Sequence, residues 1–550
     1  MADLTDAPIS SQPASIPQKR PLPIEDKHAP AVASPLNPST RIREERTKKP
    51  TAKVRKESPE PTATSKKGVK KAAKELDYPR PTRYRLNAPT SIDFEPPPPP
   101  LFIPVSTRKG RTFHQATELI TNKKGFRYAN AIADPQFTAI QYMRLTEPEP
   151  YGAHMAYEDA SAQVLFDKSN AVSTEKGFRM CRANVGAREG RWYWECRILS
   201  GVKPPNEQGT KEEAEGHVRV GWARREATLE GPVGFDAYSY GIRDVGGQKV
   251  TRSRPLDFAV SDLCEGDVIG LEITLPSLPF HRKVVEGVYN KAVDSSDDLD
   301  PAASIEEPNI VRDRTVFPYR TRRYWENFEY GYTKPLEDYM NPSPLPVNTT
   351  SEVDPPSPNN PIPQLRTLPF SSIKVYKNGE LMGTPFTDLL AFLPPASKPV
   401  PQPTSREGLD DGMLGYYPAI SVFRGGAAEA NFGPDFAYPP TELLELEDVQ
   451  MENGESFDPS QRPDKPFSGS RSRLRPMCDR FNEQIAEDIV YDLIDEIDFW
   501  ALDGSNAEGS MKDLTEAAPI TMQPIEMDTG VAVAMDGRKP ATFEMMTGQG

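Results

Sequence analysis

At 550 residues the chain is long enough for several domains, but its 59 prolines and hydrophobic fraction of 37% indicate that much of it cannot bury enough apolar surface to fold. The composition therefore predicts one globular domain interrupted by long loops. The net charge of -14 is unevenly spread: Lys and Arg dominate between Arg41 and Lys74, and the C-terminal third is acidic. No apolar run reaches the roughly 18 residues of a membrane-spanning helix, so no membrane span is expected.

The N-terminus and the cysteines favour a reducing compartment. The first residues, Met-Ala-Asp-Leu-Thr-Asp, lack the charged start and apolar core of a signal peptide. The four cysteines are far apart and form no Cys-x-x-Cys pair, so neither a zinc site nor a disulfide framework is expected. We expect no metal and no cofactor, and a nuclear or cytosolic location.

Residues 1–100 form a basic, proline-rich region that we expect to be disordered, with a stiff polyproline spacer at its end. Its basic residues suit a nuclear import signal or an arm that contacts DNA phosphates, and a solvated tail is the alternative. The basic core contains no aromatic residue, so base stacking is not indicated. The positions concerned are Lys48, Lys49, Lys53, Arg55, Lys56, Lys66, Lys67, Lys70 and Lys71.

Residues 101–440 are typical of short strands separated by turns. Apolar and polar residues alternate over 192–198, 218–222 and 269–275, which predicts strands with one face buried. We assign Trp192, Trp194 and Trp222 to the core. Asn378-Gly379 after an alternating run predicts a tight hairpin, because both central residues of such a turn need positive φ. Many short strands without alternating helices indicate an all-β fold, an antiparallel β-sandwich.

Three long insertions interrupt these strands, at residues 203–216, 276–368 and 394–412. The second has proline-rich ends and a basic aromatic middle, and the sequence gives no account of its role. Residues 441–476 are expected to be a polar linker and residues 503–550 an acidic disordered tail.

Residues 478–502 carry the strongest helical pattern in the chain. Their apolar residues share about half of the helix circumference, and Asp and Glu occupy most of the other half. So wide an apolar face must be buried, either against a partner protein or against the chain's own domain. The apolar positions are Phe481, Ile485, Ile489, Val490, Leu493, Ile494 and Ile497.

No catalytic constellation is visible. The five histidines are scattered, and there is no nucleophile elbow, phosphate-binding loop or His-Glu-x-x-His motif. We therefore do not expect an enzyme.

Several segments resemble a SPRY domain, a β-sandwich that binds peptides through surface loops. They are Gly177-Phe-Arg-Met-Cys-Arg-Ala, Gly186-Ala-Arg-Glu-Gly-Arg-Trp-Tyr-Trp-Glu-Cys, Val218-Arg-Val-Gly-Trp-Ala and Gly266-Asp-Val-Ile-Gly. Two others, Pro232-Val-Gly-Phe-Asp-Ala-Tyr-Ser-Tyr and Asn431-Phe-Gly-Pro-Asp-Phe, are closer to the Ash-two family, whose fungal members are the Bre-two type subunits of COMPASS. Ile489-Val-Tyr-Asp-Leu-Ile-Asp-Glu-Ile-Asp resembles that family's helix for docking a Dpy-thirty-type subunit. The resemblance covers roughly residues 150–275, 370–440 and 480–500.

The resemblance implies a nuclear, non-catalytic scaffold that promotes methylation of lysine 4 of histone H3. Its partners would be a SET-domain methyltransferase, a retinoblastoma-binding-type WD-repeat subunit and a Dpy-thirty-type homodimer. Contact with nucleosomal DNA, if made, would fall on the basic arm, because the cysteine pattern of the animal relatives' zinc-finger region is absent. The alternative is a SPRY substrate-recognition adaptor of a ubiquitin ligase, although no cullin-recruiting box or RING pattern is visible.

Three residues match the family's pocket for an acidic-aromatic segment of the WD-repeat subunit: Phe178, Arg219 and Pro232. An outward arginine on a rigid strand can pair with carboxylates, and aromatic and proline faces provide an apolar wall. Each also has a simpler interpretation. Arg219 could be an ordinary exposed strand residue, Phe178 a core residue and Pro232 a turn former.

Overall fold

The computed structural model describes residues 89–117, 126–135, 143–204, 216–259, 261–294, 315–341, 354–400, 408, 410, 412–443 and 473–498. The basic positions between Lys48 and Lys71, most of the expected linker and the acidic tail lie outside these ranges. Residues 89–100, which the sequence assigned to a disordered region, include the 3-10 helix η1 (Ser91–Phe94).

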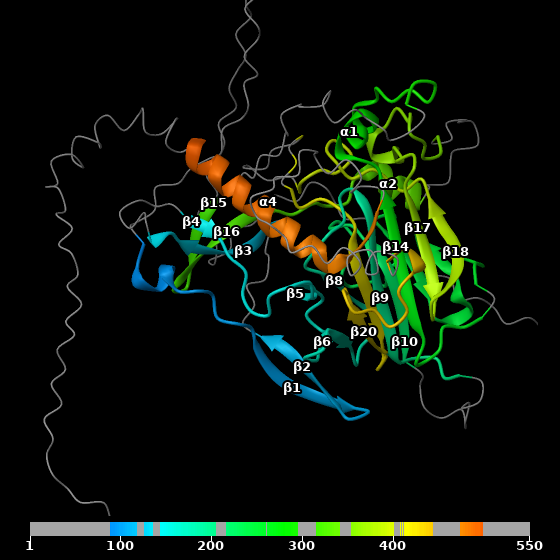
Figure 1. Ribbon diagram of the computed structural model, residues 1–550, viewed down its shortest axis with the longest axis horizontal. Helices are drawn as coiled ribbons and strands as arrows, with labels where there is room; N and C mark the ends of the chain where they lie inside the picture. The colour runs from blue at the N-terminus through cyan, green and yellow to red at the C-terminus, as the bar shows by residue number, and fades with distance from the viewer. Residues whose placement is uncertain are drawn as a thin grey trace, which may run out of the picture. The chain divides into compact units, whose positions relative to one another are not determined.

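Two mainly antiparallel sheets form the sandwich, and several of their strands are labelled in Figure 1. The first sheet has the order β1 (Leu101–Arg108), β2 (Arg111–Thr117), β6 (Leu165–Phe166), β7 (Ala171–Ser173), β20 (Ala427–Asn431), β9 (Gly190–Ser200), β14 (Val268–Leu275), β17 (Ser372–Lys377) and β18 (Glu380–Thr387). β21 (Leu474–Pro476) adds to β9 in parallel. The second sheet has the order β13 (Arg254–Leu256), β12 (Lys249–Thr251), β11 (Ser239–Arg243), β10 (His217–Ala223), β19 (Tyr417–Phe423), β8 (Arg179–Ala183) and β5 (Met155–Ala160). This architecture confirms the predicted all-β sandwich.

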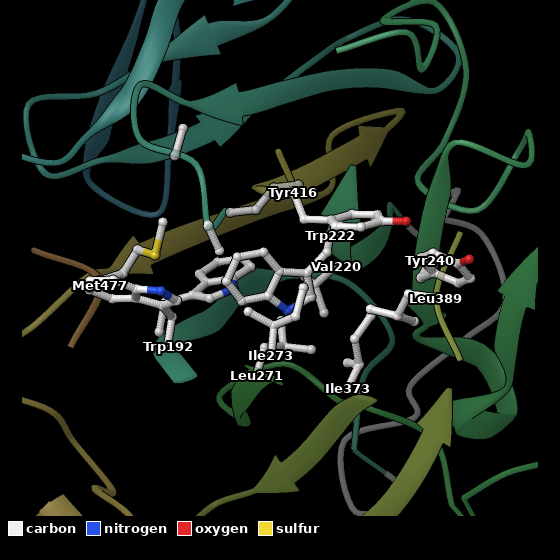
Figure 2. Packing of buried hydrophobic residues seen from close by; sticks show 14 of the residues in the cluster. Trp192, Val220, Trp222, Tyr240, Leu271, Ile273, Ile373, Leu389, Tyr416 and Met477 are labelled. Atoms are coloured by element: carbon white, nitrogen blue, oxygen red, sulfur yellow. The ribbon is translucent and has the colours of Figure 1, made fainter. Parts of the chain in front are cut away.

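The core lies between the two sheets and is built around three tryptophans. Trp192 and Trp194 from β9 and Trp222 from β10 are each no more than 1% exposed. The rings of Trp194 and Trp222 meet edge to face, with their centres 6.3 Å apart. Figure 2 shows Trp192 and Trp222 among aliphatic side chains of both sheets, with Met477 from the C-terminal helix at one side. The expected core positions of the tryptophans are confirmed.

The alternating strands differ from expectation on their second face, which is also buried. Glu195 is 2% exposed and Glu272 is fully buried. Glu195 accepts hydrogen bonds from the backbone N–H groups of Ala437 and Tyr438, which follow the last sandwich strand and cover this face. Glu272 is satisfied by Arg191 and by two neighbours on β17. A polar residue in an alternating strand does not reveal whether a segment further along the sequence will cover it. The sequence pattern therefore did not predict that this second face is buried.

The hairpin at Asn378-Gly379 forms as predicted. It joins β17 and β18, and the two turn residues have φ values of 49° and 87°. The residues on either side of the turn, Lys377 and Glu380, are paired. Positive φ at both positions gives the turn the twist that neighbouring strands require.

The insertion at 276–368 contains structure of its own. Helix α1 (Leu278–Glu286) buries Phe280 and Val284 in the sandwich core. The insertion also contains helix α2 (Lys334–Met340) and the 3-10 helix η5 (Pro363–Leu365). A further 3-10 helix, η4 (Val245–Gly247), precedes the insertion. The basic aromatic middle folds into strands β15 (Thr315–Tyr319) and β16 (Arg322–Phe328). These strands pair with β3 (Phe126–Ala133), which pairs with β4 (Met143–Leu145), to give a third sheet.

Within the described ranges no helix is long and apolar enough to cross a membrane. In the same ranges no cluster of His, Cys, Asp and Glu residues is suited to hold a metal ion. All four cysteines are free thiols.

Candidate functional site

Arg219 lies on the face of β10 that points away from the sandwich core. Its neighbours Val218 and Val220 are 2% and 1% exposed, because they point inward. The Arg219 guanidinium carbon lies 4.8 Å from the centre of the Phe178 ring, which is within the range of a cation–π contact. Phe178 is half-buried just before β8, and its ring centre lies 4.9 Å from that of Phe423. Two of the three sequence-predicted pocket residues are therefore in contact.

Arg219 carries a partly buried charge without an ion-pair partner among the described residues. It lies directly opposite Arg243 of β11. Burial, followed by repulsion from Arg243, lowers the pKa of Arg219 to about 10. A carboxylate placed here would relieve this repulsion and accept charge-assisted hydrogen bonds, so the site is chemically suited to an acidic ligand.

Pro232 reaches the same face through the loop between β10 and β11, residues 224–238, which we call the Pro232 loop. The N–H of the next residue, Val233, donates to Ser421 Oγ at 3.0 Å. Ser421 of β19 is the direct neighbour of Arg219 in the sheet. The structure thus brings Phe178 and Arg219 into contact and fastens the loop that carries Pro232 to the strand beside Arg219. We call these three residues the Arg219 pocket.

Sequence reasoning missed two residues beside this pocket. The guanidinium of Arg424 lies 5.1 Å over the ring of Phe423, and the ring of His217 lies 5.9 Å from it. His217 and Phe423 are paired residues of β10 and β19. The strand patterns were visible in the sequence, but their pairing, which unites residues about 200 positions apart, was not.

The C-terminal helix α4 (Met477–Asp498) begins as part of the sandwich. Met477 is fully buried, and Phe481 packs against the same core. Arg480 donates to the carbonyl of Gly186 at 3.1 Å and forms an ion pair with Glu487 at 2.8 Å. The first turns of the helix are therefore docked on the chain's own domain, and Phe481, predicted to face a partner, lies in this docked part.

Further along α4 three apolar side chains are about half exposed. Ile489, Val490 and Leu493 are 55%, 53% and 49% exposed. We call these three residues the α4 stripe. The side of the helix toward β4 carries an acidic residue instead, since Asp492 accepts a hydrogen bond from the N–H of Leu145 at 3.4 Å. Three neighbouring apolar side chains that are about half exposed on one helix make the stripe suited to a protein partner.

The remaining predicted helix positions are only partly described. Ile485 is half-buried between the docked turns and the stripe. Ile494 and Ile497 belong to α4, whose side chains the structure describes only as far as Leu493.

The fold and these two surfaces define an antiparallel β-sandwich with an attached helix. No protein-family model matches the chain. It is 48% identical over 520 residues to the COMPASS component cclA of Colletotrichum higginsianum, a match that covers 90% of this chain and 91% of that protein. It is 39% identical over 479 residues to the COMPASS component cclA of Aspergillus fumigatus, covering 82% and 72%. These relatives show that the chain belongs to the family of COMPASS components.

The relationship extends beyond the filamentous fungi. The Set1 complex component ash2 of Schizosaccharomyces pombe is 36% identical over 421 residues, which is 76% of this chain and about half (52%) of that protein. Among solved structures, a human SPRY domain aligns over 50% of this chain and 98% of its own length, with 13% identity and a TM-score of 0.21. We draw nothing from a score of this size.

Proposed function

We propose that the chain is a non-catalytic scaffold subunit of a COMPASS-type complex that promotes methylation of lysine 4 of histone H3 in the nucleus. The observation that supports the proposal is that a chain of this family carries two separate surfaces whose chemistry suits a protein partner. One is a charged pocket without an internal ion-pair partner among the described residues, and the other is an outward apolar stripe.

The Arg219 pocket would bind an acidic-aromatic segment of a retinoblastoma-binding-type WD-repeat subunit. The unpaired guanidinium supplies the charge, and Phe178, Phe423 and Pro232 supply flat apolar faces for an aromatic side chain. Interfaces that combine arginine with aromatic residues concentrate binding energy in a few contacts.

The α4 stripe would bind in the apolar groove between two Dpy-thirty-type chains. A helix laid into a groove uses side chains at spacings of three and four residues, and Ile489, Val490 and Leu493 have this spacing. The docked first turns hold the helix before the partner arrives, which lowers the ordering cost of binding.

The SET-domain methyltransferase would then be held and stimulated by the assembled subunits, with no chemistry contributed by this chain. The basic positions from Lys48 to Lys71 would act in nuclear import or in contact with nucleosomal DNA. That part of the proposal rests on sequence alone.

A tagged purification from nuclear extract, followed by mass spectrometry, tests the proposal. Recovery of a SET-domain methyltransferase, WD-repeat subunits and a Dpy-thirty-like protein is the expected result. Recovery of cullin and ubiquitin-transfer components in their place would contradict it and would favour the ubiquitin ligase adaptor.

A further inference from the structure

The end of the long insertion, residues 332–340, packs on the Pro232 loop, which carries Pro232 of the Arg219 pocket. The hydroxyl of Tyr332 donates to the carboxylate of Asp236 at 2.7 Å. The rings of Tyr332 and Tyr238 stack, with their centres 5.1 Å apart and their planes at 16°. The insertion thus touches the loop through a hydrogen bond and a stacked ring pair.

Two further contacts join α2 and the residue before it to the same loop. The N–H of Thr333 donates to the Tyr238 hydroxyl at 2.8 Å. The N–H of Ala237 points at the thioether sulfur of Met340, 3.0 Å away. Leu336, on the same short helix, is fully buried in a cluster that includes Val233 and Ala237. These contacts cover the C-terminal half of the Pro232 loop.

Asp236 is the centre of the loop and is 1% exposed. Its carboxylate accepts hydrogen bonds from the N–H groups of Thr228 and Tyr238 and from the hydroxyl of Ser239, each at 3.0 Å. Among the described residues that donate to this carboxylate, only Tyr332 comes from outside residues 228–239. A buried carboxylate is costly unless its oxygens are satisfied, so Tyr332 stabilises this conformation of the loop.

Tyr332 stays a donor over the whole physiological range. Burial, followed by repulsion from Asp236, raises its pKa above the usual tyrosine value. The hydrogen bond therefore does not depend on pH near neutrality.

The loop connects this anchor to the pocket. Gly234 N–H donates to Ser239 Oγ at 2.9 Å, and Val233 N–H donates to Ser421 Oγ at 3.0 Å. Phe235 N–H donates to the carbonyl of Pro232 at 3.0 Å. A shift of Asp236 would thus be passed through four consecutive residues to Pro232, next to Val233, which is bonded to the strand neighbour of Arg219.

We propose that residues 332–340 of the insertion position the Pro232 loop and thereby set the affinity of the Arg219 pocket for its acidic segment. Tyr332 is the principal positioning residue, and it need not touch the ligand. The proposal gives a role to the insertion, and its affinity part rests on the proposed function of the pocket.

The test uses the full-length chain and a synthetic peptide with the acidic-aromatic segment of the WD-repeat subunit, measured by calorimetry. Tyr332→Phe keeps the stacked ring and removes one hydrogen bond. We expect it to weaken peptide binding by about two- to tenfold and to leave binding of the Dpy-thirty-type dimer unchanged. Tyr319→Phe is the matched control, because it removes a hydroxyl from the same insertion in the hairpin of β15 and β16. It should bind the peptide as the unaltered chain does.

Hydrogen exchange of the free protein supplies a readout that needs no ligand. The N–H groups of Thr228 and Tyr238 should exchange faster in Tyr332→Phe than in the unaltered chain, and equally fast in Tyr319→Phe. Exchange rates that do not change would overturn the positioning role. If Tyr332→Phe lowers the thermal midpoint, a second variant, Met340→Leu, tests the same contact between the insertion and the loop. Met340→Leu keeps the side-chain volume but removes the sulfur acceptor, so the N–H of Ala237 must exchange faster than in the unaltered chain.

Arg219→Ala separates the two proposals. If Arg219→Ala weakens peptide binding while Tyr332→Phe does not, the Arg219 pocket binds the peptide, but residues 332–340 do not set its affinity. If the unaltered chain does not bind the peptide, the proposed pocket function fails, and hydrogen exchange alone decides whether the insertion holds the loop.

Discussion

Arg219 and Arg243 lie directly opposite each other on β10 and β11, and neither forms an ion pair within the described residues. Like charges placed across neighbouring strands oppose folding, and partial burial increases the cost. An acidic ligand bound here would relieve the repulsion between the two arginines. The first two predictions follow from this arrangement.

Replacing the charge should weaken the contact with the WD-repeat segment. Arg219→Ala should lower the binding free energy by roughly 1–3 kcal/mol, because a charge-assisted hydrogen bond is lost. Calorimetry with the purified segment measures this loss. Arg197→Ala, an exposed arginine on β9, is the matched control and should bind normally. Unchanged affinity of the Arg219 variant would show that the acidic segment binds elsewhere.

The same position should show the opposite effect on stability. Arg219→Met removes a desolvated charge and keeps an unbranched apolar side chain against Phe178, so the unfolding free energy should rise by about 1 kcal/mol. Denaturant unfolding of the isolated chain measures it. A clear loss of stability would mean that Arg219 has an ion-pair partner in the folded protein.

A charge in the α4 stripe should remove the helix-binding partner. Leu493→Glu places a carboxylate in the proposed apolar groove, where an unpaired ion is strongly unfavourable. We expect co-purification of the Dpy-thirty-type protein to be lost and that of the WD-repeat subunit to be kept. Asn482→Glu adds the same group to an exposed position of the same helix and should change neither. If the Dpy-thirty-type protein still co-purifies with Leu493→Glu, the stripe is not its docking site.

The two halves of α4 should respond differently to truncation of a side chain. Phe481 packs against the core and Leu493 is 49% exposed. Phe481→Ala should lower the unfolding free energy by about 1–3 kcal/mol, and Leu493→Ala by less than about 0.5 kcal/mol. Thermal or denaturant unfolding of the chain without partners compares them. Equal losses would contradict the division into a docked part and an outward stripe.

Glu147 should make stability depend on pH. Burial, followed by repulsion from Glu158, raises its pKa from 4.5 to about 7. Between these two pH values the unfolded chain carries an ionised Glu147 whereas the folded chain keeps it protonated. The unfolding free energy contributed by this group therefore falls as the pH rises through that window, and it is constant above it.

Glu147→Gln should remove this part of the dependence, whereas Glu149→Gln, at an exposed position, should not. Unfolding curves at pH 5, 6 and 7 give the comparison. The same slope in both variants would assign the dependence to another group.

The sequence predicted the parts of this protein that follow a simple period. The alternation around Trp192, Trp194 and Trp222 predicted their strands and the core, and Asn378-Gly379 predicted a hairpin, because both signals are local. The division of α4 into a docked part and an exposed part was not predictable. Its apolar face was evident, but only the contacts of Met477 and Arg480 show which part the chain covers itself.

The contact between the insertion and the Pro232 loop was equally beyond sequence reasoning. Asp236 and Tyr332 are almost 100 residues apart, and a single tyrosine next to a threonine carries no signal of its own. The grouping of Phe178, Arg219 and Pro232 came from a family resemblance, since three residues on three segments have no spacing that periodicity can detect.

The share of the core that belongs to β21 and α4 has a consequence for protein synthesis. Leu474 and Met477 are each no more than 1% exposed, and Met477 belongs to a core cluster whose first buried member, Met155, lies more than 300 residues earlier. A product of premature termination that ends before β21 therefore lacks both a piece of the buried interior and the stripe that follows it. Because missing core side chains leave an unfilled cavity, such a fragment should be less stable than the longer chain and a preferred substrate for proteolysis.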